Sequence, residues 1–221
     1  AYRSDCMTTA SPLITADLVA SAITYEQYVQ LSTDRLAQGL STTDDPHYNT
    51  PEIIGFVKLN LHRMSRLHKL MGLNPELRSV MARVPERWTW LVLTESWCGD
   101  AAQIVPVLHR MADESPYVEI KFLLRDQHPD LMNAHLTNGG KSIPKLICVR
   151  TRDIGSPTLR EIGTWGPRPA GLQTLMDAWR TEKLTLIDIV ERAQRWYNDD
   201  RTQATQRELL VLAASWSNVS A

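Results

Sequence analysis

The chain has little of what several classes of protein require. Its 221 residues include only three cysteines, Cys6, Cys98 and Cys148, which are too few and too scattered for a disulfide framework. So few cysteines favour a reducing compartment. The sequence has no apolar run near the roughly 20 residues that a membrane-spanning helix needs. Residues 1–10 also lack the basic start and apolar stretch of a signal peptide. We therefore expect a cytoplasmic protein without a membrane partner.

The chain also lacks an excess of charge of either sign. It has 24 Lys and Arg residues against 25 Asp and Glu residues, a formal net charge of −1. Binding to nucleic acid usually needs a basic excess, so no nucleic-acid partner is expected. The six histidines show no spacing typical of zinc ligands, either with one another or with cysteine. We expect no metal and no cofactor.

The most informative pattern lies in residues 90–111. Residues 91–94 are an apolar run with the length and bulk of a strand, and a helical pattern of apolar residues follows Cys98. A cysteine in this position lies at a helix N-terminus, where unpaired N–H groups and the helix dipole favour a thiolate. We therefore expect Cys98 to be a solvent-accessible nucleophile and the fastest-reacting of the three thiols.

This segment resembles the active-site region of the thioredoxin family. Pro106 corresponds to the proline that kinks the following helix in thioredoxins, and Ile143-Pro144 before the run at 145–148 is similar to the family's cis-proline strand. The strings at 95–101 (Glu-Ser-Trp-Cys-Gly-Asp-Ala), 142–147 (Ser-Ile-Pro-Lys-Leu-Ile) and 165–169 (Trp-Gly-Pro-Arg-Pro) are similar to those of uncharacterised bacterial members. The resemblance covers residues 50–182 and implies an α/β thioredoxin-like fold, with a central mixed sheet flanked by helices.

The sequence departs from the family at two positions. Thioredoxins carry a second, resolving cysteine where this chain has Ala101, and many bury a carboxylate where it has Val92. The resemblance then implies a monothiol oxidoreductase that acts by thiol–disulfide exchange through Cys98. A low-molecular-weight thiol or a protein thiol would be its partner. The alternative is a non-catalytic module, with a cysteine retained after redox function was lost, that holds a peptide or protein in the cis-proline groove.

Around the catalytic candidate Cys98 we expect a substrate-binding site that contains Trp97, Gly99, Asp100, Ile143, Pro144 and Arg168. A cis bond before Pro144 would leave the Ile143 backbone free to pair with a bound peptide or glutathione-like backbone, although the proline could also be only a structural turn. Asp100 is expected to oppose thiolate formation, and Arg168 is expected to favour it. Alternatively, Asp100 and Arg168 form an ion pair with each other.

Three further side chains are weaker candidates. Arg125 follows the strand pattern at 118–124 and could approach the thiol, although an ion pair with Asp126 is the simpler expectation. Glu95 could accept a proton, but a solvated position in a loop is the simpler expectation. Cys148 is expected to be buried in the sheet.

Helical patterns flank the thioredoxin-like segment on both sides. We expect a disordered arm at 1–15, a helical N-terminal extension packed on the domain at 16–86, the thioredoxin-like domain at 87–182 and a C-terminal helical extension at 183–221. Helices are expected at 24–40, 51–71, 75–84, 128–136, 170–180, 184–199 and 205–216, with a last strand at 158–164. In helix 51–71, Lys58, Arg63, Arg66 and Lys69 are expected to lie off the apolar stripe. The usual first strand of thioredoxins is expected to be missing or disguised, because the segment before Trp88 has a helical pattern. The last helix packs on the body or forms a homodimer.

Overall fold

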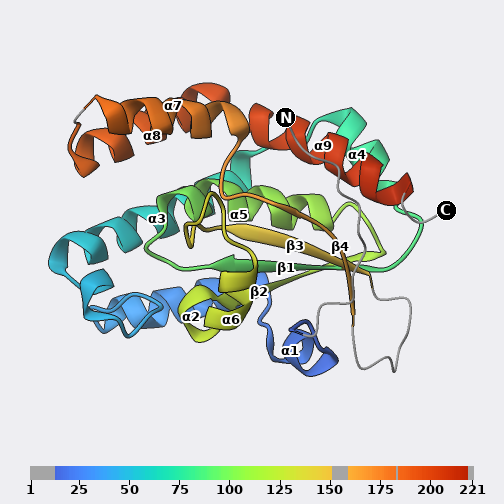
Figure 1. Ribbon diagram of the computed structural model, residues 1–221, viewed down its shortest axis with the longest axis horizontal. Coiled ribbons are helices and arrows are strands. Elements are labelled where there is room, and N and C mark those ends of the chain that lie inside the picture. The colour runs from blue at the N-terminus through green and yellow to red at the C-terminus, as the bar shows by residue number, and fades with distance from the viewer. Residues whose placement is uncertain (1–12, 151–158, 183, 219–221) are drawn as a thin grey trace.

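The computed structural model describes residues 13–150, 159–182 and 184–218 (Figure 1). Its centre is a four-stranded sheet in the order β2-β1-β3-β4. The strands are β1 (Trp88–Thr94), β2 (Val118–Leu124), β3 (Lys145–Arg150) and β4 (Arg160–Trp165). Strands β1 and β2 run parallel, whereas β3 pairs antiparallel with both β1 and β4. This mixed sheet confirms the expected fold class.

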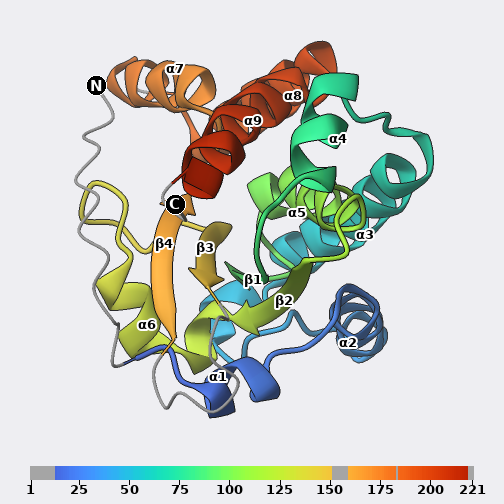
Figure 2. The same cartoon turned by 90° about the vertical axis from the view of Figure 1, so that its right-hand side faces the viewer.

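Helices cover both faces of the sheet (Figures 1 and 2). Helices α3 (Pro51–Leu70) and α5 (Gly99–Ala112) lie on one side, and α1 (Ala16–Ser21) and α6 (Pro129–Ala134) lie on the other. Helix α2 (Tyr25–Ala37) contacts β2 and α3. Beyond α5 lies an outer layer of α4 (Pro75–Ala82), α7 (Ala170–Thr181), α8 (Leu186–Asp200) and α9 (Gln203–Asn218). Two short 3-10 helices, η1 (Pro46–Tyr48) and η2 (Arg125–Gln127), complete the described elements.

Strand β1 is longer than the apolar run at 91–94 from which it was expected. Every residue of β1 and of β3 is buried, because helices cover both faces of the sheet. The strand therefore begins at Trp88 rather than at residue 91, and Trp88 and Trp90 are both buried in the core. Cys148 lies in the middle of β3 and is fully buried, as expected.

A single-residue bridge occupies the edge of β2, where a first strand would pair. The Ile23 amide donates to the Phe122 carbonyl at 3.0 Å, and the Phe122 amide donates to the Ile23 carbonyl at 2.8 Å. The pairing stops there because Thr24 caps α2 in a capping box with Gln27. The helix that starts at Thr24 thus limits this pairing to a single residue, and among the described residues no longer strand pairs with this side of β2.

The C-terminal helix packs on the body of the chain. Arg201 and Thr202 have positive φ angles of 52° and 68°, which separates α8 from α9. Helix α9 then places Trp216 against β4 so closely that a Cβ at Gly163 would lie 2.0 Å from the Trp216 indole nitrogen. Packing on the body is therefore the arrangement seen, and a homodimer through α9 stays a prediction.

The N-terminal segment is only partly described. Residues 1–12, which include Cys6, lie outside the described residues. Ile14, at the end of the expected arm, is buried, and its carbonyl accepts a hydrogen bond from the Leu159 amide at 3.2 Å. The chain is therefore already packed by residue 14, although the arm was expected to run to residue 15.

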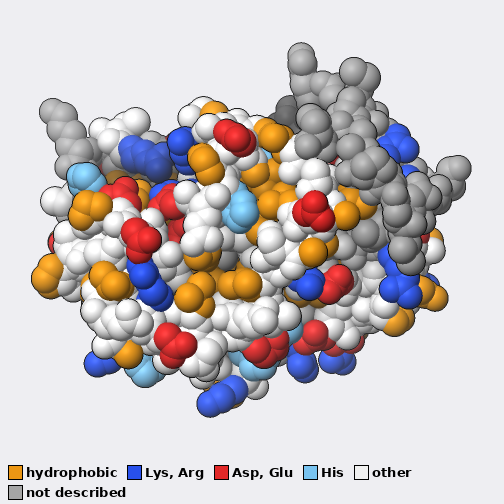
Figure 3. Space-filling model, turned by 90° about the horizontal axis from the view of Figure 1, so that it is seen from below, with side chains coloured by type: hydrophobic (Ala, Val, Ile, Leu, Met, Phe, Trp, Pro, Cys, Tyr) orange, Lys and Arg blue, Asp and Glu red, His pale blue; other side chains and the backbone are white. Residues whose placement is uncertain are grey.

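The distribution of charged side chains on the surface agrees with the near-zero net charge. Acidic and basic side chains are interspersed on the face seen from below (Figure 3). None of the helices in the described part of the chain is long and apolar enough to cross a membrane.

Candidate functional site

Cys98 lies between the end of β1 and the start of α5, as the sequence predicts. Its sulfur accepts a hydrogen bond from the Ala101 amide at 3.5 Å, so the side chain is the N-cap of α5. The thiol also donates to the Ile143 carbonyl at 3.2 Å. The Ile143–Pro144 peptide bond is cis. The turn before α5 and the loop before β3 therefore meet at the thiol.

The Cys98 thiol is buried, in contrast to the solvent-accessible thiol that we expected. The residue is only 7% exposed. Burial raises the pKa of the Cys98 thiol to about 12, and the Asp100 carboxylate adds to this effect. The Ala101 amide and the Arg168 guanidinium lower the pKa, but by less. The helix N-terminus does favour a thiolate here, but desolvation outweighs it.

Asp100 and Arg168 form the ion pair that the sequence left as the alternative. Nη2 and Nε of Arg168 donate to one Asp100 oxygen at 2.7 and 3.0 Å. The other Asp100 oxygen accepts from the Tyr197 hydroxyl at 2.7 Å. The side chains of Arg168 and Asp100 are only 9% and 13% exposed. The same two groups act on Cys98 in the expected opposite directions. Ion pairing and influence on the thiol therefore occur together.

The loop that carries Arg168 is held from two sides. A Cβ at Gly166 would lie 2.3 Å from the Pro144 carbonyl oxygen, so a larger residue would collide with the cis-proline segment. Gly166 also has a φ of 109°, which favours glycine. Glu208 of α9 accepts from the Trp165 indole at 2.9 Å and from the Ala170 amide at 2.7 Å. These contacts fix the loop, and with it the position of Arg168.

A pocket of about 360 Å³ lies beside Cys98. Every expected site residue except Pro144 lines it. Its lining consists of Trp97, Cys98, Gly99 and Asp100, then Lys141, Ser142 and Ile143, then Arg125, Tyr48, Arg168 and Met176, with Glu52, Ile53, Phe56, Asn60 and Arg63 from α3 and Ile187, Val190, Ala193 and Gln194 from α8. The predicted residues are thus brought together as one wall, and α3 and α8, both outside the domain expected at 87–182, supply another.

The contribution of α3 was missed in the sequence. Ile53, Phe56, Asn60 and Arg63 recur every three or four residues and so share one face of the helix. Asn60 on this face is buried, and its Nδ2 donates to the Ser96 carbonyl at 3.0 Å. A polar residue and a cation on this face mask its periodicity, which is why Arg63 was expected to lie simply off the apolar stripe.

Helix α8 was also missed as part of the site. Besides the Tyr197 contact with Asp100, Gln194 accepts from Gln103 Nε2 at 2.9 Å. The Gln194 amide nitrogen would lie 3.3 Å from a Cβ at Gly99. An amphipathic helix is visible in the sequence, but nothing in its pattern shows that it covers the start of α5.

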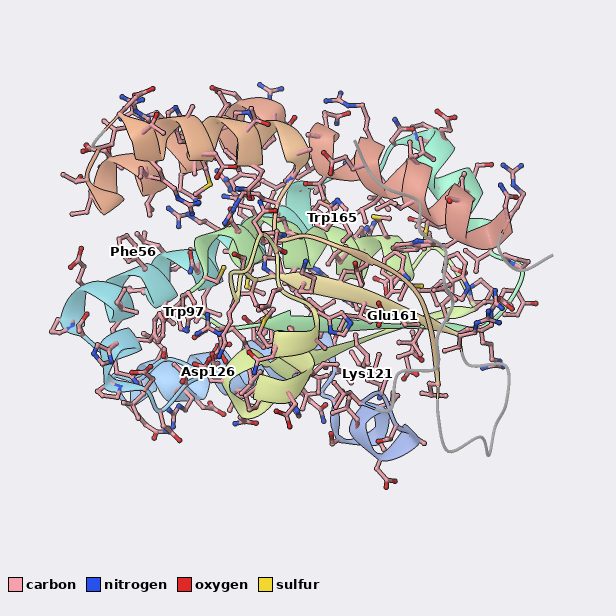
Figure 4. All side chains as sticks on the ribbon, in the orientation of Figure 1. Phe56, Trp97, Lys121, Asp126, Glu161 and Trp165 are labelled. Atoms are coloured by element: carbon pink, nitrogen blue, oxygen red, sulfur yellow. The ribbon has the colours of Figure 1, made fainter. Side chains whose placement is uncertain are left out.

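Aromatic and cationic side chains form a further part of the pocket wall. The Trp97 and Tyr48 rings stack at 4.1 Å between centroids, and the Arg125 guanidinium lies 4.8 Å from the Trp97 ring centroid. Arg125 Nε also pairs with Asp126 at 2.7 Å, the simpler of the two roles expected for it. Figure 4 shows Trp97 at the same end of the molecule as Phe56 and Asp126. Trp97 lines the pocket, as expected.

The family model described as thioredoxin matches residues 49–180. The chain belongs to the thioredoxin family. It is similar to the crystal structure of PA1234, a protein of unknown function from Pseudomonas aeruginosa, with a TM-score of 0.53 and 15% identity over 93% of this chain and 98% of that one. An HIV epitope-scaffold matches at a TM-score of 0.47 and 17% identity, over 85% and 96% of the two chains. A comparison with curated protein sequences gives no match.

This thioredoxin-family chain buries a carboxyl group close to its cysteine in sequence, but not at position 92. Val92 is buried in β1, whereas Glu95 lies beyond the strand and is fully buried. One Glu95 oxygen accepts from the Thr42 hydroxyl, and the other accepts from the Asp126 amide at 3.1 Å. Burial raises the pKa of Glu95 to about 7. The expected solvated position was therefore wrong, because the segment that contains Thr42 covers this loop.

The described residues include two cysteines, and only one of them lies at the pocket. Cys98 and Cys148 are both free and buried, and burial raises the pKa of Cys148 well above its ordinary value. Within residues 13–150, 159–182 and 184–218, no group of His, Cys, Asp or Glu side chains is arranged to hold a metal ion. Cys98 is thus the one described thiol that borders the pocket.

Proposed function

We propose that the protein is a monothiol oxidoreductase that exchanges thiols with a small molecule bound in the pocket beside Cys98. The supporting observation is the pocket itself, which has Cys98 and Ile143 in its wall. Its volume of about 360 Å³ lies in the range typical of small-molecule sites. Because α3 and α8 also line it, a small thiol or disulfide fits this site better than the surface of a folded protein does. A reducing, cytoplasmic location is part of the proposal.

The reaction would proceed in two displacements. Cys98 loses its proton, and the thiolate attacks one sulfur of a bound disulfide while the S–S bond breaks. The other sulfur leaves as a thiolate and takes up a proton. A low-molecular-weight thiol then attacks the mixed disulfide, and Cys98 leaves and is reprotonated. Because Ala101 occupies the position of a resolving cysteine, this second thiol has to come from outside the chain.

The surrounding groups have defined parts in these steps. The Ala101 amide and Arg168 stabilise the thiolate at the start of α5, whereas Asp100 and burial oppose it. The raised pKa makes the first displacement slow at neutral pH and faster as the pH rises. It also makes Cys98 a poor leaving group, which slows the second displacement, in which the external thiol releases Cys98.

The second candidate function is the non-catalytic binding module, which would hold a small ligand, or a peptide or protein partner, next to the cis-proline loop. One observation favours it: the buried Cys98 thiol caps α5 and donates to the Ile143 carbonyl. In that case the thiol is part of the framework of the pocket and does not react.

Mixed-disulfide formation distinguishes the two functions. The folded protein is incubated with hydroxyethyl disulfide, and adducts are mapped by mass spectrometry, with Cys98→Ser as the control. The exchange proposal predicts an adduct at Cys98 that a small thiol removes. An adduct at Cys98 only after unfolding would reject exchange and favour the binding module.

A further inference from the structure

Arg63 is a cation of the pocket wall whose charge is not matched by a carboxylate. The side chain is half-buried and lines the pocket from α3. Its Nη1 donates to Asn60 Oδ1 at 2.9 Å. Among the described residues no carboxylate forms an ion pair with it, although a guanidinium offers five donors and buried cations are usually paired.

The other charged side chains that line the pocket are either paired with an opposite charge or exposed to solvent. Arg168 is paired with Asp100 and Arg125 is paired with Asp126. Glu52 and Lys141 are exposed. Burial, and after it the like charge of Arg66, lowers the pKa of Arg63. Among the described residues, Arg63 is therefore a half-buried cation of the pocket wall that no carboxylate pairs with.

Arg63 is connected to the loop of Cys98. Asn60 accepts from Arg63 and donates to the Ser96 carbonyl at 3.0 Å, so two hydrogen bonds join the guanidinium to the backbone just before Cys98. On the same face of α3, Ile53 and Phe56 present apolar surface to the pocket. Across the pocket, α8 contributes Ile187 and Val190. A ligand that reaches the thiol is thus offered apolar surface from α3 and α8, with the Arg63 guanidinium on the α3 wall.

We propose that the natural ligand of this pocket is a small molecule with an acidic group, bound by Arg63, on an apolar or methylene body that lies between α3 and α8. For a reacting ligand, which rests on the proposed function, this means a thiol or disulfide that carries a carboxylate. A guanidinium recognises a carboxylate with two parallel hydrogen bonds, and its partial burial strengthens the contact. The acidic ligand supplies the counter-charge that the chain itself does not.

Two disulfides of similar length test the charge preference. Dithiodipropionate carries a carboxylate at each end, and hydroxyethyl disulfide is neutral. We expect the first to modify Cys98 about tenfold faster or more, as one charge-assisted contact allows. Arg63→Gln should abolish this preference, measured as the ratio of the two rates within each variant, so that a change common to both disulfides cancels. Lys58→Gln is the matched control, because it removes an exposed cation of α3 that does not line the pocket.

A binding measurement separates this inference from the exchange reaction. Calorimetry on Cys98→Ser compares phenylpropionate with phenylpropanol, which has the same body without the charge. Tighter binding of the acid, lost in Arg63→Gln and kept in Lys58→Gln, supports the acidic ligand even if neither disulfide reacts with Cys98. In that event only the exchange function is rejected. Equal binding of acid and alcohol, together with equal rates of the two disulfides, overturns the inference.

Discussion

At the scale of single residues, the Cys98 thiol is subject to opposing influences. The N-terminus of α5 and Arg168 stabilise a thiolate, and burial and Asp100 oppose it. Burial is the largest of these effects. The motif in the sequence predicts where the thiol lies, whereas its pKa depends on surfaces far away in the chain.

Replacing either partner of the Asp100–Arg168 pair should move the pKa of Cys98. Asp100→Asn removes a nearby negative charge and should lower the pKa by roughly 1 unit, and Arg168→Gln should raise it by a similar amount. The pH dependence of the Cys98 alkylation rate measures both. Because the two side chains pair directly, the double variant should deviate from the sum of the single effects. No change in either single variant would show that the pair does not act on the thiol.

Glu95 should make stability depend on pH. Its pKa is raised from 4.5 to about 7, so between these values the unfolded chain has lost a proton that the folded chain keeps. The free energy of unfolding should therefore fall as the pH rises through this window, by up to about 3 kcal/mol.

The variant Glu95→Gln has no carboxyl group at this position, so its free energy of unfolding should not fall over this pH window. Urea unfolding at several pH values measures it. Glu191→Gln, which changes an exposed carboxylate of α8, should keep the wild-type profile. If Glu95→Gln also keeps the wild-type profile, the Glu95 carboxyl does not hold its proton in the folded protein.

At the scale of elements, the sequence predicts a helix more readily than the surface that the helix covers. Helix α3 begins at Pro51, as expected, and Thr50 caps it. The pocket face of α3 was not predicted, because Asn60 and Arg63 interrupt its apolar character. Contacts of this kind depend on another part of the chain, such as Ser96, and leave no periodic signal.

The packing of α9 on β4 can be tested at Gly163. A Cβ there would lie 2.0 Å from the Trp216 indole nitrogen, so Gly163→Ala should cost roughly 1–3 kcal/mol of stability by overpacking. Gly55→Ala is the matched control: it lies inside α3 with open space around it and should stabilise by about 0.5–1 kcal/mol. Denaturant midpoints compare the two. Equal stability of Gly163→Ala and the wild type would show that α9 does not pack there.

At the scale of the whole molecule, the order of elements was predictable and the closure of the site was not. Strand, cysteine, helix and proline strand appear in the sequence in family order, and the mixed sheet follows from them. The residues around Cys98 come together as predicted because they lie in loops, or in the first turn of α5, at the same end of β1, β3 and β4. Helices α3 and α8 also reach this end of the sheet, but their positions depend on packing between distant segments. The sequence shows only that each of the two helices is amphipathic.

The most direct test is the rate at which Cys98 forms a mixed disulfide with hydroxyethyl disulfide, followed by mass spectrometry over a wide pH range in a Cys6→Ser, Cys148→Ser background. With a pKa of about 12, the rate should rise about tenfold per pH unit without levelling off near pH 9, where an ordinary thiol does. An early plateau would contradict the buried, protonated thiol. The absence of any adduct at Cys98 at every pH where the protein stays folded would contradict thiol exchange itself.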